Sequence, residues 1–249
     1  MWYPLPQIGH LEMPTTPNPR TPNHRDMSAS LLKLRNLAPV LLTLTGAAMF
    51  LQPTTAAAHP HEFVTMEVNA KFDFAGKVSG LTYNWTFDEF FTAYAVDGQD
   101  LNKNGEAEPN ELAALLDEIL GNIKVINYFT VFDKEKTVPK LTTAEPLESV
   151  MVDRQLRLKF YVPFQEPVSL DKAPLRFSIY DDEFYIAMNF EPKANDKIVP
   201  ASVDNCTAKV DLAEPDDELV AFASSLDRTQ SAGGGLGAAF AEWVTIKCN

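Results

Sequence analysis

Residues 63–74 read FVTMEVNAKFDF, and the pattern of this stretch decides the fold. Apolar side chains alternate with polar ones, so that one side of an extended chain carries Val64, Met66, Val68, Ala70, Phe72 and Phe74. Period-two alternation over this length predicts a strand with one buried and one solvated face. Ala75 and Gly76 form a turn signal, so we expect residues 77–87 to return as the second strand of a hairpin.

Further stretches with strand character follow along the chain, at residues 156–162, 175–180, 184–190, 207–212 and 243–248. Three helices are expected at residues 87–96 (with Thr86 as N-cap), 110–122 and 215–225. The glycine-rich residues 231–237 are expected to form a flexible loop. The sequence therefore predicts an α+β fold, mainly antiparallel and sandwich-like, with a helix-loop-helix insertion at about residues 87–122.

The N-terminal region has the organisation of a secretion signal. Lys33 and Arg35 precede an apolar run at residues 37–51, and small residues follow up to Ala58. This pattern predicts a signal peptide at residues 27–58, cleaved after Ala58, with no membrane insertion of the product. Residues 1–26 are interpreted as an unstructured upstream extension, and residues 59–249 as one domain.

Charge and cysteine content narrow the class of protein. The net charge of −13 disfavours nucleic acid as a partner, because an acidic surface repels phosphates. The two cysteines, Cys206 and Cys248, are expected to form a disulfide in an exported chain. The other interpretations, metal thiolates or free buried thiols, have no CxxC spacing to support them.

Cleavage after Ala58 would make His59 the first residue, with His61 two positions further on. A terminal amine and its own imidazole form a six-membered chelate with Ni²⁺, Cu²⁺ or Zn²⁺, and His61 can add a third nitrogen. Pro60 has no N–H, so its nitrogen cannot ligate as a deprotonated amide. A further ligand would come from Asp181, Asp182 or Glu183. The alternative is that these histidines are only the exposed start of a strand.

Residues 100–111 read DLNKNGEAEPNE and match the calcium-binding loop of EF-hands at every constrained position. The expected oxygen ligands are the side chains of Asp100, Asn102 and Asn104, the carbonyl of Glu106, Glu108 through water, and both carboxylate oxygens of Glu111. A single loop with three carboxylates predicts a weak, structural Ca²⁺ site. The alternative is an acidic helix-loop-helix that holds no ion.

Several of these motifs together resemble the DUF1007 family: His59-Pro60-His61, residues 85–91, the loop at 100–111, and Tyr180-Asp181 before Phe184-Tyr185-Ile186. The resemblance covers essentially all of residues 59–249. It implies a periplasmic metal-handling protein that works with an inner-membrane metal permease. It also implies His59 and His61 as ligands, with Asp181 added. Relatives tend to show Asp-Pro where this chain has Asp181-Asp182, so this turn departs from the family pattern.

The sequence thus predicts a non-enzymatic, periplasmic accessory protein of a transition-metal transport system, holding Ni²⁺, Co²⁺ or Zn²⁺ and a structural Ca²⁺. Two other functions remain open at this point. One is a copper-dependent oxidoreductase that uses the terminal histidine. The other is a structural envelope protein that binds another protein through its acidic face.

Overall fold

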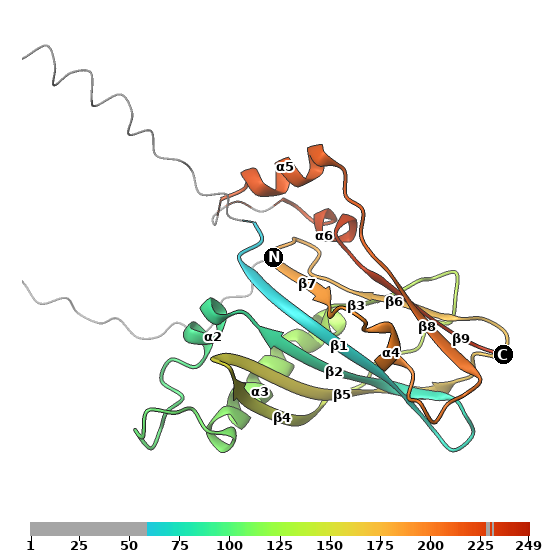
Figure 1. Ribbon diagram of the computed structural model, residues 1–249, viewed down its shortest axis with the longest axis horizontal. Coiled ribbons are helices and arrows are strands. Elements are labelled where there is room, and N and C mark those ends of the chain that lie inside the picture. Colours follow the sequence, from blue (N-terminus) through green and yellow to red (C-terminus); the bar gives the residue numbers. More distant parts are fainter. Residues whose placement is uncertain (1–58, 228–229, 231) are drawn as a thin grey trace, which may run out of the picture. The chain divides into compact units, whose positions relative to one another are not determined.

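The computed structural model describes residues 59–227, 230 and 232–249 (Figure 1). The expected upstream extension, signal peptide and cleavage site after Ala58 lie outside the described residues. Within these, the elements follow in this order: β1 (Glu62–Phe72), β2 (Val78–Phe87), α2 (Glu89–Ala95), α3 (Pro109–Ile123), η2 (Lys124–Phe129), β3 (Thr130–Phe132), β4 (Glu145–Val152), β5 (Gln155–Val168), β6 (Leu175–Ile179), β7 (Ile186–Phe190), α4 (Asn195–Ile198), β8 (Cys206–Asp211), α5 (Asp217–Ser225), α6 (Leu236–Ala239) and β9 (Trp243–Cys248).

The strands form two sheets. A five-stranded sheet has the order β4-β5-β2-β1-β7, and a four-stranded sheet has the order β3-β6-β9-β8. Paired strands run antiparallel in both sheets, with the exception of β1 and β7. The fold is therefore mixed, with mostly antiparallel sheets and few helices, as the α+β prediction required.

The core lies on the inner face of the five-stranded sheet. The alternation of residues 63–74 is confirmed over most of its length, because Val64, Met66, Val68 and Ala70 are at most 2% exposed. These side chains belong to one buried cluster with residues of the second sheet, such as Phe177, and with residues of α3, such as Leu116. Phe74 breaks the pattern: it is fully exposed, since β1 ends at Phe72 and the chain has already entered the hairpin turn.

The parallel pairing of β7 with β1 is the exception in the mainly antiparallel fold that the sequence predicted. β6 ends in the four-stranded sheet, and the chain crosses to the five-stranded sheet through residues 180–185. It arrives beside the edge of β1 that β2 leaves free, with Glu62 opposite Ile186 and Met66 opposite Phe190. Strand alternation predicts which face is buried but not which neighbour a strand takes, so the sequence pattern could not give this direction.

The helices lie close to their expected positions, but α2 begins differently. Its N-cap is Asp88, whose carboxylate accepts hydrogen bonds from the backbone N–H groups of Phe90 and Phe91 at 2.7 and 2.9 Å. Thr86, the expected cap, lies within β2. The buried Thr92 joins this helix to β5, because its Oγ1 accepts a hydrogen bond from Leu156 N at 2.9 Å.

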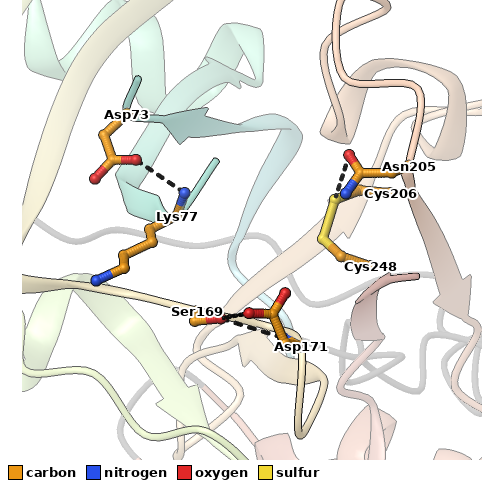
Figure 2. Close-up of a disulfide and its surroundings, with 7 residues drawn as sticks. All are labelled: Asp73, Lys77, Ser169, Asp171, Asn205, Cys206 and Cys248. Carbon is orange, nitrogen blue, oxygen red and sulfur yellow. Dashed lines mark hydrogen bonds between the residues drawn. A yellow bond between two sulfur atoms is a disulfide. The ribbon is translucent and has the colours of Figure 1, made fainter. Parts of the chain in front are cut away.

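The expected disulfide between Cys206 and Cys248 is present (Figure 2). The two cysteines lie directly opposite each other in the antiparallel pair of β8 and β9, and 42 positions separate them in the sequence. A cross-link of this span stabilises the folded state by about 4 kcal/mol on the chain-entropy account. It also closes the end of the four-stranded sheet at the last strand of the chain.

A buried hydrogen-bond network joins the two sheets beneath α3. Tyr83 of β2 bonds through its hydroxyl to Thr130 Oγ1 at 2.8 Å, and that atom also donates to the carbonyl of Tyr128. The Tyr128 hydroxyl accepts a hydrogen bond from Ala144 N at 2.8 Å and donates to Thr142 O at 3.3 Å. Tyr128 stands in a run of left-handed backbone, Asn127 to Phe129, which costs free energy in residues other than glycine. The network compensates for that cost.

We predict that Tyr128→Phe lowers the free energy of unfolding by about 1–3 kcal/mol, because it leaves the buried N–H of Ala144 without an acceptor. Urea denaturation followed by tryptophan fluorescence measures the change. Tyr94→Phe is the matched control, since Tyr94 is 62% exposed. An unfolding free energy of Tyr128→Phe equal to that of the control would contradict the role of the network.

A second buried contact between the sheets involves Glu242, which directly precedes β9. One of its carboxylate oxygens accepts a hydrogen bond from Phe190 N at 2.6 Å, at the end of β7. Its backbone carbonyl accepts one from Ser178 Oγ at 2.7 Å. Burial raises the pKa of Glu242, and the N–H of Phe190 offsets part of that rise. The carboxyl group is therefore ionised less readily in the folded protein than in the unfolded chain.

Because folding raises the pKa of Glu242, the stability of the folded protein depends on pH in a defined direction. Over the window between the unfolded and folded pKa values, the folded state holds a proton that the unfolded state has lost, so stability falls as pH rises. Glu242→Gln keeps a hydrogen-bond acceptor and removes the titration. We predict that its melting temperature, relative to that of the wild type, increases between pH 4 and pH 8. A constant difference across that range, measured by thermal denaturation, would show that Glu242 does not titrate in this way.

Candidate functional site

The candidate site lies where β1 begins, beside the turn through which the chain crosses between the sheets. The N–H groups of His61 and Glu62 both donate to the carbonyl of Tyr185, at 2.8 and 3.4 Å. Tyr185 directly precedes β7, so this contact extends the parallel pairing of β1 and β7 by one residue. It brings the histidine segment next to the Asp181 turn, although the two lie far apart in the sequence.

Three aromatic rings pack together at this position. The ring centroids of His59 and His61 are 4.6 Å apart, with an interplanar angle of 67°. The ring of Tyr185 lies 4.6 Å from that of His61 and 6.0 Å from that of His59. The structure therefore brings together the two histidines that the sequence singled out, and it adds Tyr185, which the sequence analysis named only as part of the family motif. The peptide bond between His59 and Pro60 is cis.

His59 is not the exposed start of a strand, because only 6% of its surface is accessible. Its Nδ1 atom is buried and has no hydrogen-bond partner. A buried ring nitrogen without a partner costs free energy, since it has given up its bond to water. The alternative interpretation, that the histidines are only the exposed start of a strand, therefore does not hold for His59.

The Asp181 carboxylate accepts three hydrogen bonds from the backbone of its own turn. Oδ2 accepts hydrogen bonds from Tyr185 N at 2.8 Å and Ile186 N at 3.1 Å, and Oδ1 accepts one from Glu183 N at 3.3 Å. Burial raises the pKa of Asp181, while these three N–H groups act in the opposite direction. Asp181 therefore lies beside Tyr185, and its contacts hold the turn that carries Tyr185.

Glu62 is a further residue that the sequence analysis missed. Burial, together with the nearby carboxylates of Asp88 and Asp181, raises the pKa of Glu62 to about 7. The sequence did contain a signal for Glu62, because the alternation of β1 places this residue on the same side as the buried Val64. An acidic residue at an inward position of a strand marks an unusual environment.

The glycine-rich segment packs against the Asp181 turn, which differs from the flexible loop expected there. The N–H groups of Gly235 and Gly237 both donate to the carbonyl of Asp182, at 3.1 and 3.0 Å. Gly235, with φ of +102°, is the N-cap of α6. Phe184 stacks on Phe240 at a centroid distance of 4.0 Å, so the turn is also held by apolar contact.

The loop at residues 100–111 lies between α2 and α3, and its side chains fold back on its own backbone. Asp100 accepts hydrogen bonds from Asn104 N at 3.0 Å and Gly105 N at 2.8 Å. Glu111, only 6% exposed, reaches back from α3 and accepts bonds from the N–H groups of Leu101 and Asn102, both at 3.0 Å. The first and last acidic residues of the motif thus both bond to the loop backbone.

The side chains of Asn102, Asn104 and Glu108 are also hydrogen-bonded within the loop. The amide nitrogens of Asn102 and Asn104 donate to the Glu108 carboxylate at 3.1 and 3.3 Å. Glu106 N donates to Asn104 Oδ1 at 2.9 Å. Gly105 has φ of +92°, the left-handed conformation that the central glycine of the motif requires.

Neither the start of β1 nor the loop at residues 100–111 contains a complete set of strong metal ligands. Across residues 59–227, 230 and 232–249, no three side chains of His, Cys, Asp or Glu are grouped so that they could hold a metal ion. At the β1 start there are two imidazoles, and in the loop two of the expected oxygen ligands are Asn amides. In the same part of the chain, no helix has the length and apolar character needed to cross a bilayer.

Comparison with known proteins identifies the family. The family described as "Protein of unknown function (DUF1007)" matches residues 44–248, so the chain belongs to it. A protein of Haemophilus influenzae, described as uncharacterized, is 29% identical over 195 residues, which cover 77% of this chain and 91% of that protein. Residues 44–248, which the family model matches, include the histidine segment, the loop at 100–111 and both cysteines.

Proposed function

We propose that this member of the DUF1007 family is an exported metal-binding protein, whose His59 and His61 capture a divalent transition metal in the periplasm for an inner-membrane permease. The single observation that carries the proposal is the pair of histidine rings 4.6 Å apart, with the Nδ1 of His59 buried and without a hydrogen-bond partner. Imidazole is the commonest protein ligand of Zn²⁺, Ni²⁺ and Co²⁺, so these two side chains fit such an ion.

The small number of metal-binding atoms at the histidine site suits transfer of a metal ion better than its storage. Two imidazoles, joined by the amino group of His59 if cleavage follows Ala58, leave coordination positions open. A closed, four-ligand site holds its ion permanently, whereas an incomplete one can pass the ion to another protein. The disulfide between Cys206 and Cys248 supports the proposed location, because such bonds persist in oxidising compartments.

The proposal includes a structural Ca²⁺ in the loop at residues 100–111. Asp100, Asn102, Asn104, the carbonyl of Glu106, Glu108 and Glu111 would supply its oxygens, which are the ligands Ca²⁺ prefers. Support comes from the left-handed Gly105 and from Glu111, which α3 already holds against the start of the loop. The ion would fix the connection between α2 and α3.

For the histidine site, we predict that the protein beginning at His59 binds Ni²⁺, Co²⁺, Zn²⁺ or Cu²⁺ in isothermal titration, and that His59→Ala/His61→Ala abolishes that binding. A chain with one extra glycine before His59 is the control for the amino group; it should bind more weakly and still bind. Equal binding by the double variant would exclude the histidines. Oxygen consumption by the copper-loaded protein with a reductant would instead favour an oxidoreductase.

For the loop, we predict that Ca²⁺ raises the melting temperature and that Glu111→Gln removes this rise, because the carboxylate of Glu111 closes the ligand shell. Glu118→Gln makes the same change of charge on the exposed side of α3 and should keep the rise. Comparing each variant with and without Ca²⁺ separates loss of the ion from loss of the hydrogen bonds that Glu111 accepts. A full rise in Glu111→Gln would show that Ca²⁺ binds elsewhere.

A further inference from the structure

We propose that Asp181 is a positioning residue that sets the geometry of the two histidines through Tyr185 without ligating the metal, and that Gly237 holds Asp181 in place. The inference rests on the proposed histidine site and replaces the ligand role that the sequence suggested for Asp181.

The Asp181 carboxylate can accept only a limited number of hydrogen bonds. Each carboxylate oxygen offers about two lone-pair directions. Oδ2 of Asp181 uses both for the N–H groups of Tyr185 and Ile186, at 2.8 and 3.1 Å. A metal ion at Oδ2 would have to displace one of these bonds and so disturb the residue that lies against both histidines.

Tyr185 connects Asp181 to the two histidines. The residue that Asp181 fixes by its N–H group also accepts, through its carbonyl, the N–H group of His61 at 2.8 Å. The centroid of its ring lies 4.6 Å from that of His61 and 6.0 Å from that of His59, to which it is perpendicular. The position of Asp181 is therefore transmitted to the histidine backbone and to both rings by direct contacts.

Close packing of Gly237 holds the backbone of Asp181 in place. A Cβ atom at Gly237 would lie 1.8 Å from the backbone carbonyl oxygen of Asp181 and 2.8 Å from its carbonyl carbon. Backbone atoms cannot yield to such an overlap, so position 237 accepts only glycine at this approach. With the bonds from Gly235 and Gly237 to Asp182, the start of α6 fixes the turn from the side of the four-stranded sheet.

Gly234 provides the matched control. A Cβ atom there would lie 2.6 Å from Oδ2 of Asp182, the far end of a flexible side chain that can move away. Gly234→Ala and Gly237→Ala thus make the same chemical change in the same segment, and only the second displaces the backbone of Asp181.

The test measures the dissociation constant for Co²⁺ of the protein beginning at His59, together with the imidazole NMR signals of His59 and His61 in the metal-free state. Asp181→Asn keeps an oxygen for Tyr185 and Ile186, so we expect its affinity to stay within about threefold of the wild type. Asp181→Ala and Gly237→Ala should each weaken binding by about 10- to 100-fold, as loss of orienting partners does at metal sites. Gly234→Ala should bind like the wild type.

The outcomes separate this inference from the proposed function. A loss in Asp181→Asn as large as in Asp181→Ala, with Gly237→Ala unchanged, would make Asp181 a ligand and overturn the inference. A wild-type protein that binds no metal would overturn the proposed function alone. In that case the NMR signals decide: Asp181→Ala and Gly237→Ala must shift the imidazole signals, and unshifted signals would overturn the positioning role. If Gly237→Ala does not fold, the comparison of Asp181→Asn with Asp181→Ala carries the test.

Discussion

The carbonyl of Tyr185, which accepts hydrogen bonds from both His61 and Glu62, is the contact on which the candidate site depends. It is the first bond of the parallel pairing between β1 and β7, and it is made at the point where the chain enters the five-stranded sheet. Because a strand has two edges, β1 can pair with β2 on one side and receive β7 on the other. The histidine segment and the Asp181 turn therefore meet only because the second edge of β1 is occupied.

Some parts of the fold could be predicted because they depend on local patterns. The hairpin of β1 and β2 follows from alternation around Ala75 and Gly76, and α3 follows from its apolar stripe. The disulfide followed from the number of cysteines in an expected exported chain. β4 was missed because it is an edge strand whose first four residues are exposed, so its sequence carries no alternation. A one-sided pattern exists only where one side is buried.

In the candidate site, too, the local features could be predicted from the sequence and the non-local ones could not. The spacing of His59 and His61 suggested that the two imidazoles converge, and their rings do lie together. The surroundings of Asp181 could not be predicted, because its hydrogen bonds depend on the geometry of a non-local turn and on glycines from a distant segment. Acidity alone does not distinguish a ligand from an Asp that bonds to its own backbone. The sequence suggested that this glycine-rich segment is flexible, whereas Gly234 and Gly237 permit close packing and Gly235 permits a left-handed backbone conformation.

The two proposed ions would not compete for each other's sites, and the reason lies in the donor atoms. The loop at residues 100–111 presents only oxygens, which suit the hard cation Ca²⁺, while His59 and His61 present nitrogens, which suit borderline metals. The net charge of −13 attracts every cation and discriminates among none. Selectivity must therefore arise from the histidines, and it is only as good as their mutual orientation. A device that fixes that orientation without occupying a coordination position, as the Asp181 turn does in our proposal, keeps the site selective while leaving it open for release.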